Sequence, residues 1–185
     1  MVTPKNGVNH IRFYPIYLPK LISKFPIAKK QYLERTKIME SASLMLAISE
    51  ATRQDAINLF NVPPTKIINI GIAPSDDYYN IPDSEGKLEE SVRKQFNIGK
   101  PFLLTVSNTD HRKNLSALLK AFSSLPKTIL KEFTLVIVTN SQPQYIESHP
   151  EISQYVSGRT EAEIKLIYSA SNYELCTLYN SCSAF

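Results

Sequence analysis

An apolar run, a polar loop and an amphipathic stretch follow one another between residues 101 and 126. The run at 102–107, FLLTVS, is short and rich in β-forming residues, as is typical of a buried parallel strand. Beyond the loop, apolar residues recur at the spacing of one helix face: Leu115, Leu118, Leu119 and Phe122. Asp110 is the expected N-cap of this helix, and Pro126 ends the pattern. A strand followed in this way by a helix predicts an α/β fold.

Two cations, Arg112 and Lys113, stand where the strand has ended and the predicted helix begins. In open α/β sheets, ligands bind at the carboxyl ends of the strands. A helix N-terminus carries a partial positive charge, so each cation there costs about 0.3–1 kcal/mol. A phosphate or diphosphate would reverse that sign, because backbone N–H groups and both side chains would point at it. The alternative, in which both side chains extend into water, stays open.

The composition is that of a globular protein that can bury a core. The 185 residues are 43% hydrophobic and 21% charged, enough for one ordinary domain or two small ones. A formal net charge of +4 weakly favours acidic ligands or an anionic membrane surface, and no nucleic-acid partner is indicated. No run approaches the ~18 apolar residues of a membrane span, and no signal peptide is expected. Cys176 and Cys182 lack the second pair that a metal site would need.

Strand and helix signals alternate along the rest of the chain. We expect strands at 43–48, 66–70, 133–139 and 164–168 and from 183 onward, and helices at 27–42, 50–60, 88–96 and from 171 onward. Tight turns between strand, helix and strand predict parallel pairing. Ser171 and Glu174 form a capping box, and Gly99 is the expected left-handed cap. The loop 140–150 is predicted to be polar and irregular, with a helix interrupted by Gly158 after it.

The stretch 73–100 separates two α/β parts. It begins with prolines and acidic residues of little periodicity, which indicates a linker that ends in a short helix. The parts on either side are 1–72 and 101–185. Within the first, the basic region 20–37 is typical of a solvated helix face, with contact to anionic lipid head groups as the alternative.

Three separate segments together resemble the family-four glycosyltransferases. They are LAISEATRQD at 46–55 with VPPTKI at 62–67, the stretch 102–122 with RKN at 112–114, and LxxLY at 175–179. The resemblance implies a retaining enzyme of the GT-B fold, which has two Rossmann-like domains. Residues 1–72 would be the C-terminal part of the acceptor-side domain, and 101–185 the N-terminal part of the donor-binding domain, both incomplete. It also implies a role in cell-surface polysaccharide synthesis.

The resemblance assigns roles to four positions. Arg112 and Lys113 would bind the donor diphosphate and stabilise the charge on the departing nucleoside diphosphate. Asn114 would fix the loop or cap the helix, and Gly71 would be the hinge-side glycine after the last strand of the first domain. The donor would be a GDP- or UDP-linked sugar, the acceptor a saccharide or a lipid-linked saccharide, and no metal is expected.

The family's paired glutamates and its glycine-rich loop have no match among the 185 residues. No catalytic residue is therefore assigned, and the chain alone is expected to lack transferase turnover. A non-catalytic nucleotide-phosphate-binding or interaction remnant is the alternative function. We expect a cytoplasmic protein, and the alternative for the basic region 20–37 is peripheral contact with the inner membrane face.

Overall fold

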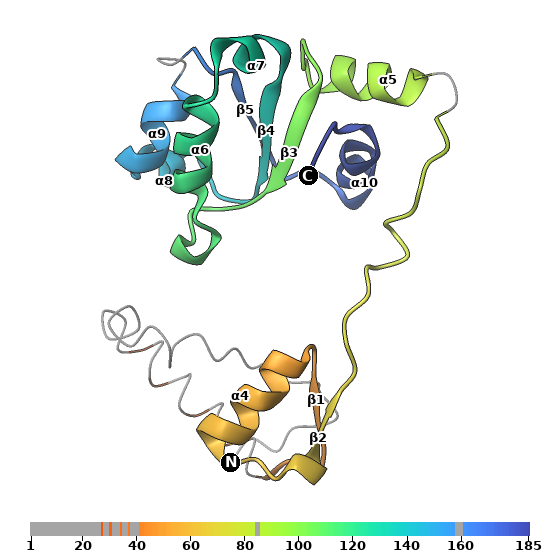
Figure 1. Ribbon diagram of the computed structural model, residues 1–185, viewed down its shortest axis with the longest axis vertical. Coiled ribbons are helices and arrows are strands. Elements are labelled where there is room, and N and C mark those ends of the chain that lie inside the picture. The colour runs from red at the N-terminus through yellow and green to blue at the C-terminus, as the bar shows by residue number, and fades with distance from the viewer. Residues whose placement is uncertain are drawn as a thin grey trace. The chain divides into compact units, whose positions relative to one another are not determined.

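The computed structural model describes residues 41–83, 86–157 and 161–185, together with positions 27, 30, 34 and 37. The chain divides into two units, Met1–Ala73 and Pro74–Phe185. Each unit combines parallel strands with helices, which confirms the predicted α/β class (Figure 1). None of the helices in the described part of the chain has the length and apolar character needed to cross a bilayer.

In the first unit, β1 (Met45–Ala47) and β2 (Ile67–Asn69) pair in parallel, as predicted, and α4 (Glu50–Phe60) connects them. The hydroxyl of Ser49 caps α4 by accepting from the N–H of Thr52 at 3.1 Å. Helix and sheet share a small core: Ala47, Ala56, Val62 and Ile67. Most of the predicted helix 27–42 and of the basic region 20–37 lies outside the described residues.

The second unit carries a larger sheet. Its elements, in chain order, are α5 (Lys87–Gln95), β3 (Phe102–Val106), α6 (Leu115–Ser123), α7 (Lys127–Glu132), β4 (Thr134–Thr139), α8 (Pro143–Glu147), α9 (Pro150–Val156), β5 (Ile164–Tyr168) and α10 (Asn172–Ser181). Among the described residues, the strands pair in parallel in the order β3-β4-β5. Ala184 bridges Leu103 in parallel, where a further strand is predicted to begin. Because β4 takes one edge of β3, this bridge occupies the other edge.

Helices cover both faces of this sheet (Figure 1). Leu135 and Ile137 of β4 pack with α6 to α9, whereas Val136 and Val138 pack with α5 and α10 on the opposite face. Such double burial is what a near-continuous apolar strand in a parallel sheet predicts. The chain leaves β3 through α6 on one face and returns to the other edge of β3 through α10 on the opposite face. The carboxyl end of β3 therefore lies at a topological switch point, where ligands bind in doubly wound folds.

Three local predictions are wrong. The helix after β3 has Asn114, not Asp110, at its N-cap, because residues 111–113 form a separate 3₁₀ turn. Gly99 does not take the left-handed conformation; Asn97 does, with φ of 51°, and its short amide side chain tolerates that region. The loop predicted as irregular at 140–150 contains α8 and the start of α9.

Candidate functional site

A pocket of about 260 Å³ lies where β3, β4 and β5 end. Its polar lining comes from the residues at these ends, including Ser107 after β3, Thr139 closing β4 and Ser169 after β5. Lys113 adds a positive charge, and Leu175 of α10 adds an apolar surface. Parallel strands present their carboxyl ends at one edge, so this is the position at which the topology predicts a ligand.

Backbone hydrogen bonds hold the strand ends at the pocket in register. The N–H of Ser107 donates to the carbonyl of Val138, and the N–H of Ser169 donates to the carbonyl of Thr139, both at 3.0 Å. Ser107 and Thr139 are buried. Ser169 adopts φ of 56°, a left-handed conformation that is uncommon outside glycine. Strained residues of this kind gather at binding sites, where the surrounding structure enforces them.

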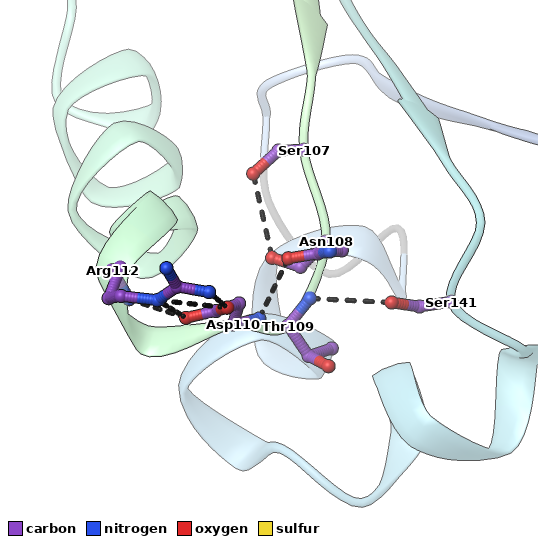
Figure 2. A network of polar contacts seen from close by, with 6 residues as sticks. All are labelled: Ser107, Asn108, Thr109, Asp110, Arg112 and Ser141. Atoms are coloured by element: carbon purple, nitrogen blue, oxygen red, sulfur yellow. Dashed lines mark hydrogen bonds and ion pairs between the residues drawn. The ribbon is translucent and has the colours of Figure 1, made fainter. Parts of the chain in front are cut away.

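Hydrogen bonds within the loop from 107 to 113, and one to Ser141, hold this loop in place (Figure 2). The N–H of Thr109 donates to the hydroxyl of Ser141 at 3.3 Å, and the N–H of Asp110 donates to the side-chain oxygen of Asn108 at 3.0 Å. The N–H of Lys113 donates to the carbonyl of Asp110 at 2.8 Å. These amides are thus already used within the protein. N–H groups without an intrahelical acceptor remain in the first turn of α6, as at any helix start.

The side chain of Arg112 is paired with Asp110 (Figure 2). Its Nε lies 2.9 Å from Oδ1 and 3.1 Å from Oδ2, and its Nη2 also donates to Oδ2. The backbone N–H of Arg112 donates to the same carboxylate at 3.0 Å. Of the two predicted cations, Lys113 lines the pocket, whereas Arg112 is not among the described residues that line it. The two cations are neighbours in the 3₁₀ turn at 111–113, but the arginine side chain is paired with the carboxylate of Asp110.

Asn114 and Gly71 both adopt left-handed backbone conformations in this structure. Asn114 stands at the N-cap of α6 with φ of 48°, and its side chain makes no capping hydrogen bond. Gly71 follows β2 in the first unit with φ of 67°, and its N–H donates to the side-chain oxygen of Asn69 at 3.0 Å. A Cβ at Gly71 would meet no atom within 4 Å. Glycine is therefore favoured here by the left-handed backbone and not by crowding from neighbouring atoms.

Sequence reasoning does not single out Asp110 as a partner of Arg112, and it misses the serines and threonine at the strand ends. The sequence does contain a signal that could have identified the serines and the threonine. Ser107, Thr139 and Ser169 each stand at or just after the end of a predicted strand, and parallel strands that end at one edge bring such residues together. The Asp110 pairing has no comparable signal, because it depends on the 3₁₀ turn at 111–113.

Comparison with family models gives no match for this chain. The chain is similar to the serotype-specific mannosyltransferase WbdA of Escherichia coli, with 24% identity over 160 residues, which covers 86% of this chain and 19% of WbdA. It is also similar to the O-antigen chain mannosyltransferase B of Escherichia coli, with 29% identity over 114 residues, which covers 60% of this chain and 29% of that protein. The matched part spans about a fifth of the length of WbdA. These relatives support a glycosyltransferase family.

Proposed function

We propose that this chain carries the donor-binding part of a glycosyltransferase that moves a sugar from a nucleotide-linked donor to a saccharide or lipid-linked acceptor. The relatives' names support mannose as the sugar and O-antigen or related polysaccharide synthesis as the setting. GDP-mannose is therefore the first donor to test, ahead of UDP-sugars. The retaining mechanism, the family-four assignment and the GT-B arrangement are parts of the same proposal, as is a cytoplasmic location.

One observation carries the proposal: Lys113, which directly precedes the N-cap residue of α6, lines a pocket at the carboxyl ends of three parallel strands among the described residues. A donor diphosphate placed there would meet the Lys113 ammonium and the polar residues at the strand ends, including Ser107, Thr139 and Ser169. Cleavage of the glycosyl–phosphate bond leaves a nucleoside diphosphate, and preorganised cations stabilise the charge that develops on it. Arg112 would supply the second cation. We expect nucleotide binding to persist in EDTA, since these cations would replace a divalent ion.

Calorimetric titration of the chain with GDP and UDP tests the site. A charge-assisted contact to phosphate contributes roughly 1.5–3 kcal/mol, so Lys113→Ala should weaken binding about tenfold or more. Lys120 is a matched control, because it is exposed on the last turn of α6 and does not line the pocket. Lys120→Ala should bind like the wild type. Equal affinities for Lys113→Ala and the wild type would exclude this site.

A measurement of sugar transfer distinguishes an active glycosyltransferase from the non-catalytic alternative, a remnant that only binds nucleotide. No residue of this sequence is assigned to the chemical step, so we expect the chain to bind nucleotide without steady transfer. Incubation with radiolabelled GDP-mannose and lipid-linked or free saccharide acceptors measures transfer directly. Sustained incorporation of label into an acceptor would contradict that expectation and would place catalytic groups within these residues.

We also propose peripheral contact with anionic lipid through the basic region 20–37. Its described lysines, Lys30 and Lys37, are helical and exposed. Basic residues near an anionic bilayer each contribute about 1 kcal/mol of attraction. Co-sedimentation with vesicles that contain phosphatidylglycerol should therefore exceed that with pure phosphatidylcholine vesicles, and the excess should fall in high salt. Equal sedimentation with both vesicles would contradict the contact.

A further inference from the structure

We propose that Asp110 lowers the affinity of the diphosphate site by holding Arg112 as an internal counter-ion that a bound phosphate must replace. This inference rests on the proposed function, because it concerns the same site. Asp110 would then be a residue that sets the affinity for donor and product without contacting either of them.

The contacts around Asp110 describe an arginine that already has an anionic partner. The carboxylate accepts from both Nε and Nη2 of Arg112 (Figure 2). This is the two-pronged geometry in which guanidinium groups bind carboxylates and phosphates alike. A phosphate that takes the same edge of the guanidinium must therefore displace Asp110.

Exposure makes this exchange feasible. The side chains of Asp110 and Arg112 are both 30% exposed, so water and ligand can reach the ion pair. Partly exposed ion pairs are weak, because water screens their attraction. A diphosphate carries more negative charge than a carboxylate and has more acceptor oxygens. It is therefore the stronger partner for Arg112 once Lys113 has drawn it to the pocket.

Asp110 also has anchors that do not depend on the guanidinium. Its N–H donates to Asn108, and its carbonyl accepts from the N–H of Lys113. Its carboxylate also accepts the backbone N–H of Arg112 at 3.0 Å. The loop can thus keep its shape when the guanidinium leaves. The carboxylate then stays near the site and repels the anion, which lowers affinity and favours product release.

Asp110→Asn is the variant that isolates the charge, because an asparagine oxygen can still accept the backbone N–H of Arg112. Glu132→Gln is the matched control: Glu132 is exposed at the end of α7, and its substitution changes the net charge equally. Inorganic pyrophosphate is the probe, titrated into the full 185-residue chain. We expect Asp110→Asn to bind about two- to fivefold more tightly than the wild type, and Glu132→Gln to bind like it. Equal or weaker binding by Asp110→Asn overturns the proposal.

A second readout reports on Arg112 itself. In the free wild type, the Nε–H of Arg112 is hydrogen-bonded and should exchange slowly with water in NMR spectra, and Asp110→Asn should speed that exchange. Saturating pyrophosphate should shift this resonance in the wild type; a resonance that does not move overturns the proposal. Failure of the proposed function would give a different result from failure of this inference. In that case Lys113→Ala and the wild type respond alike to pyrophosphate, whereas failure of this inference leaves the Lys113→Ala defect in place.

Discussion

The side-chain amide of Asn180 donates a hydrogen bond of 3.0 Å to the backbone carbonyl of Tyr79, 101 residues earlier in the chain. Its oxygen accepts from the N–H of Ile81 at 2.9 Å. One asparagine on α10 therefore satisfies a donor and an acceptor of the segment that precedes α5. This segment lacks regular structure, so its backbone groups need partners of this kind.

Replacement of Asn180 by alanine should lower the free energy of unfolding by about 1 kcal/mol, since the partly buried N–H of Ile81 loses its acceptor, whereas the exposed carbonyl of Tyr79 keeps the thiol of Cys176 as a donor. Asn172 offers a matched control on the same helix, because its side chain bonds Asp77 in an exposed contact. Asn172→Ala should cost about 0.5 kcal/mol or less. Urea unfolding followed by circular dichroism measures both. Equal losses would mean that Asn180 does not secure the segment.

Helix α6 contributes Leu119 to the core on the sheet face that α6 to α9 cover. Leu119 is 0% exposed in that core, whereas the adjacent Leu118 is 38% exposed. Leu119→Ala should lower the free energy of unfolding by about 2–5 kcal/mol, because a cavity is left behind. Leu118→Ala should lower it by less than about 1 kcal/mol. Thermal unfolding of the two variants provides the comparison, and similar losses would contradict the assigned helix face.

Much of the fold follows from local pattern in the sequence. The apolar runs predict β3 and β4, the turn lengths predict parallel pairing in both units, and the capping box predicts the start of α10, where Ser171 and Glu174 do bond reciprocally. These features are decided by residues close together in the chain. Periodicity and capping therefore suffice to predict them.

The missed helices share a physical cause. Pro126 is the predicted end of one helix, yet it also precedes the first residue of α7. Pro143 and Pro150 stand in the first turns of α8 and α9. Proline ends a helix but also suits a helix start, where no N–H is needed. These helices are short, and they are held by contacts with the sheet through residues such as Ile146 and Ile152. The local sequence pattern does not predict these long-range contacts, and it therefore does not predict the helices.

The sequence predicts an anion site at Arg112 and Lys113 but does not predict how their side chains are oriented. Both cations follow the end of β3 and precede the start of α6, and of the two only Lys113 is among the described residues that line the pocket. Which cation faces the pocket depends on the 3₁₀ turn and on Asp110, and neither has a sequence signature. Tertiary geometry, and not residue type, decides that Lys113 lines the pocket.

The left-handed backbone at Ser169 leads to a prediction about strain at the pocket rim. A residue with a Cβ pays about 1–2 kcal/mol in this region, while glycine loses about 0.5–1 kcal/mol through chain entropy. Ser169→Gly should therefore raise the free energy of unfolding by about 0.5 kcal/mol, and Ser169→Val should lower it by at least about 1 kcal/mol. Ser169→Ala keeps the strain and should match the wild type. Chemical denaturation of the three variants tests this, and a glycine variant less stable than the alanine variant would contradict it.

Acid stability should depend on Glu174. Hydrogen bonds from the backbone N–H and then the hydroxyl of Ser171 hold the pKa of the Glu174 carboxyl below its usual value of 4.5. A pKa that is lower in the folded state means that ionised Glu174 stabilises the fold at pH values above about 4.5. That stabilisation is lost as the pH falls through the lower, folded-state pKa.

Glu174→Gln removes this titration while keeping a side chain that can complete the capping box. The difference in unfolding free energy between wild type and Glu174→Gln should therefore be largest near neutral pH and should shrink as the pH falls below about 4.5. Glu132→Gln, at an exposed position on α7, controls for the change in net charge. Urea unfolding from pH 7 to pH 3 measures the difference. If the difference between wild type and Glu174→Gln stays constant over that range, Ser171 does not act on the ionised form of Glu174.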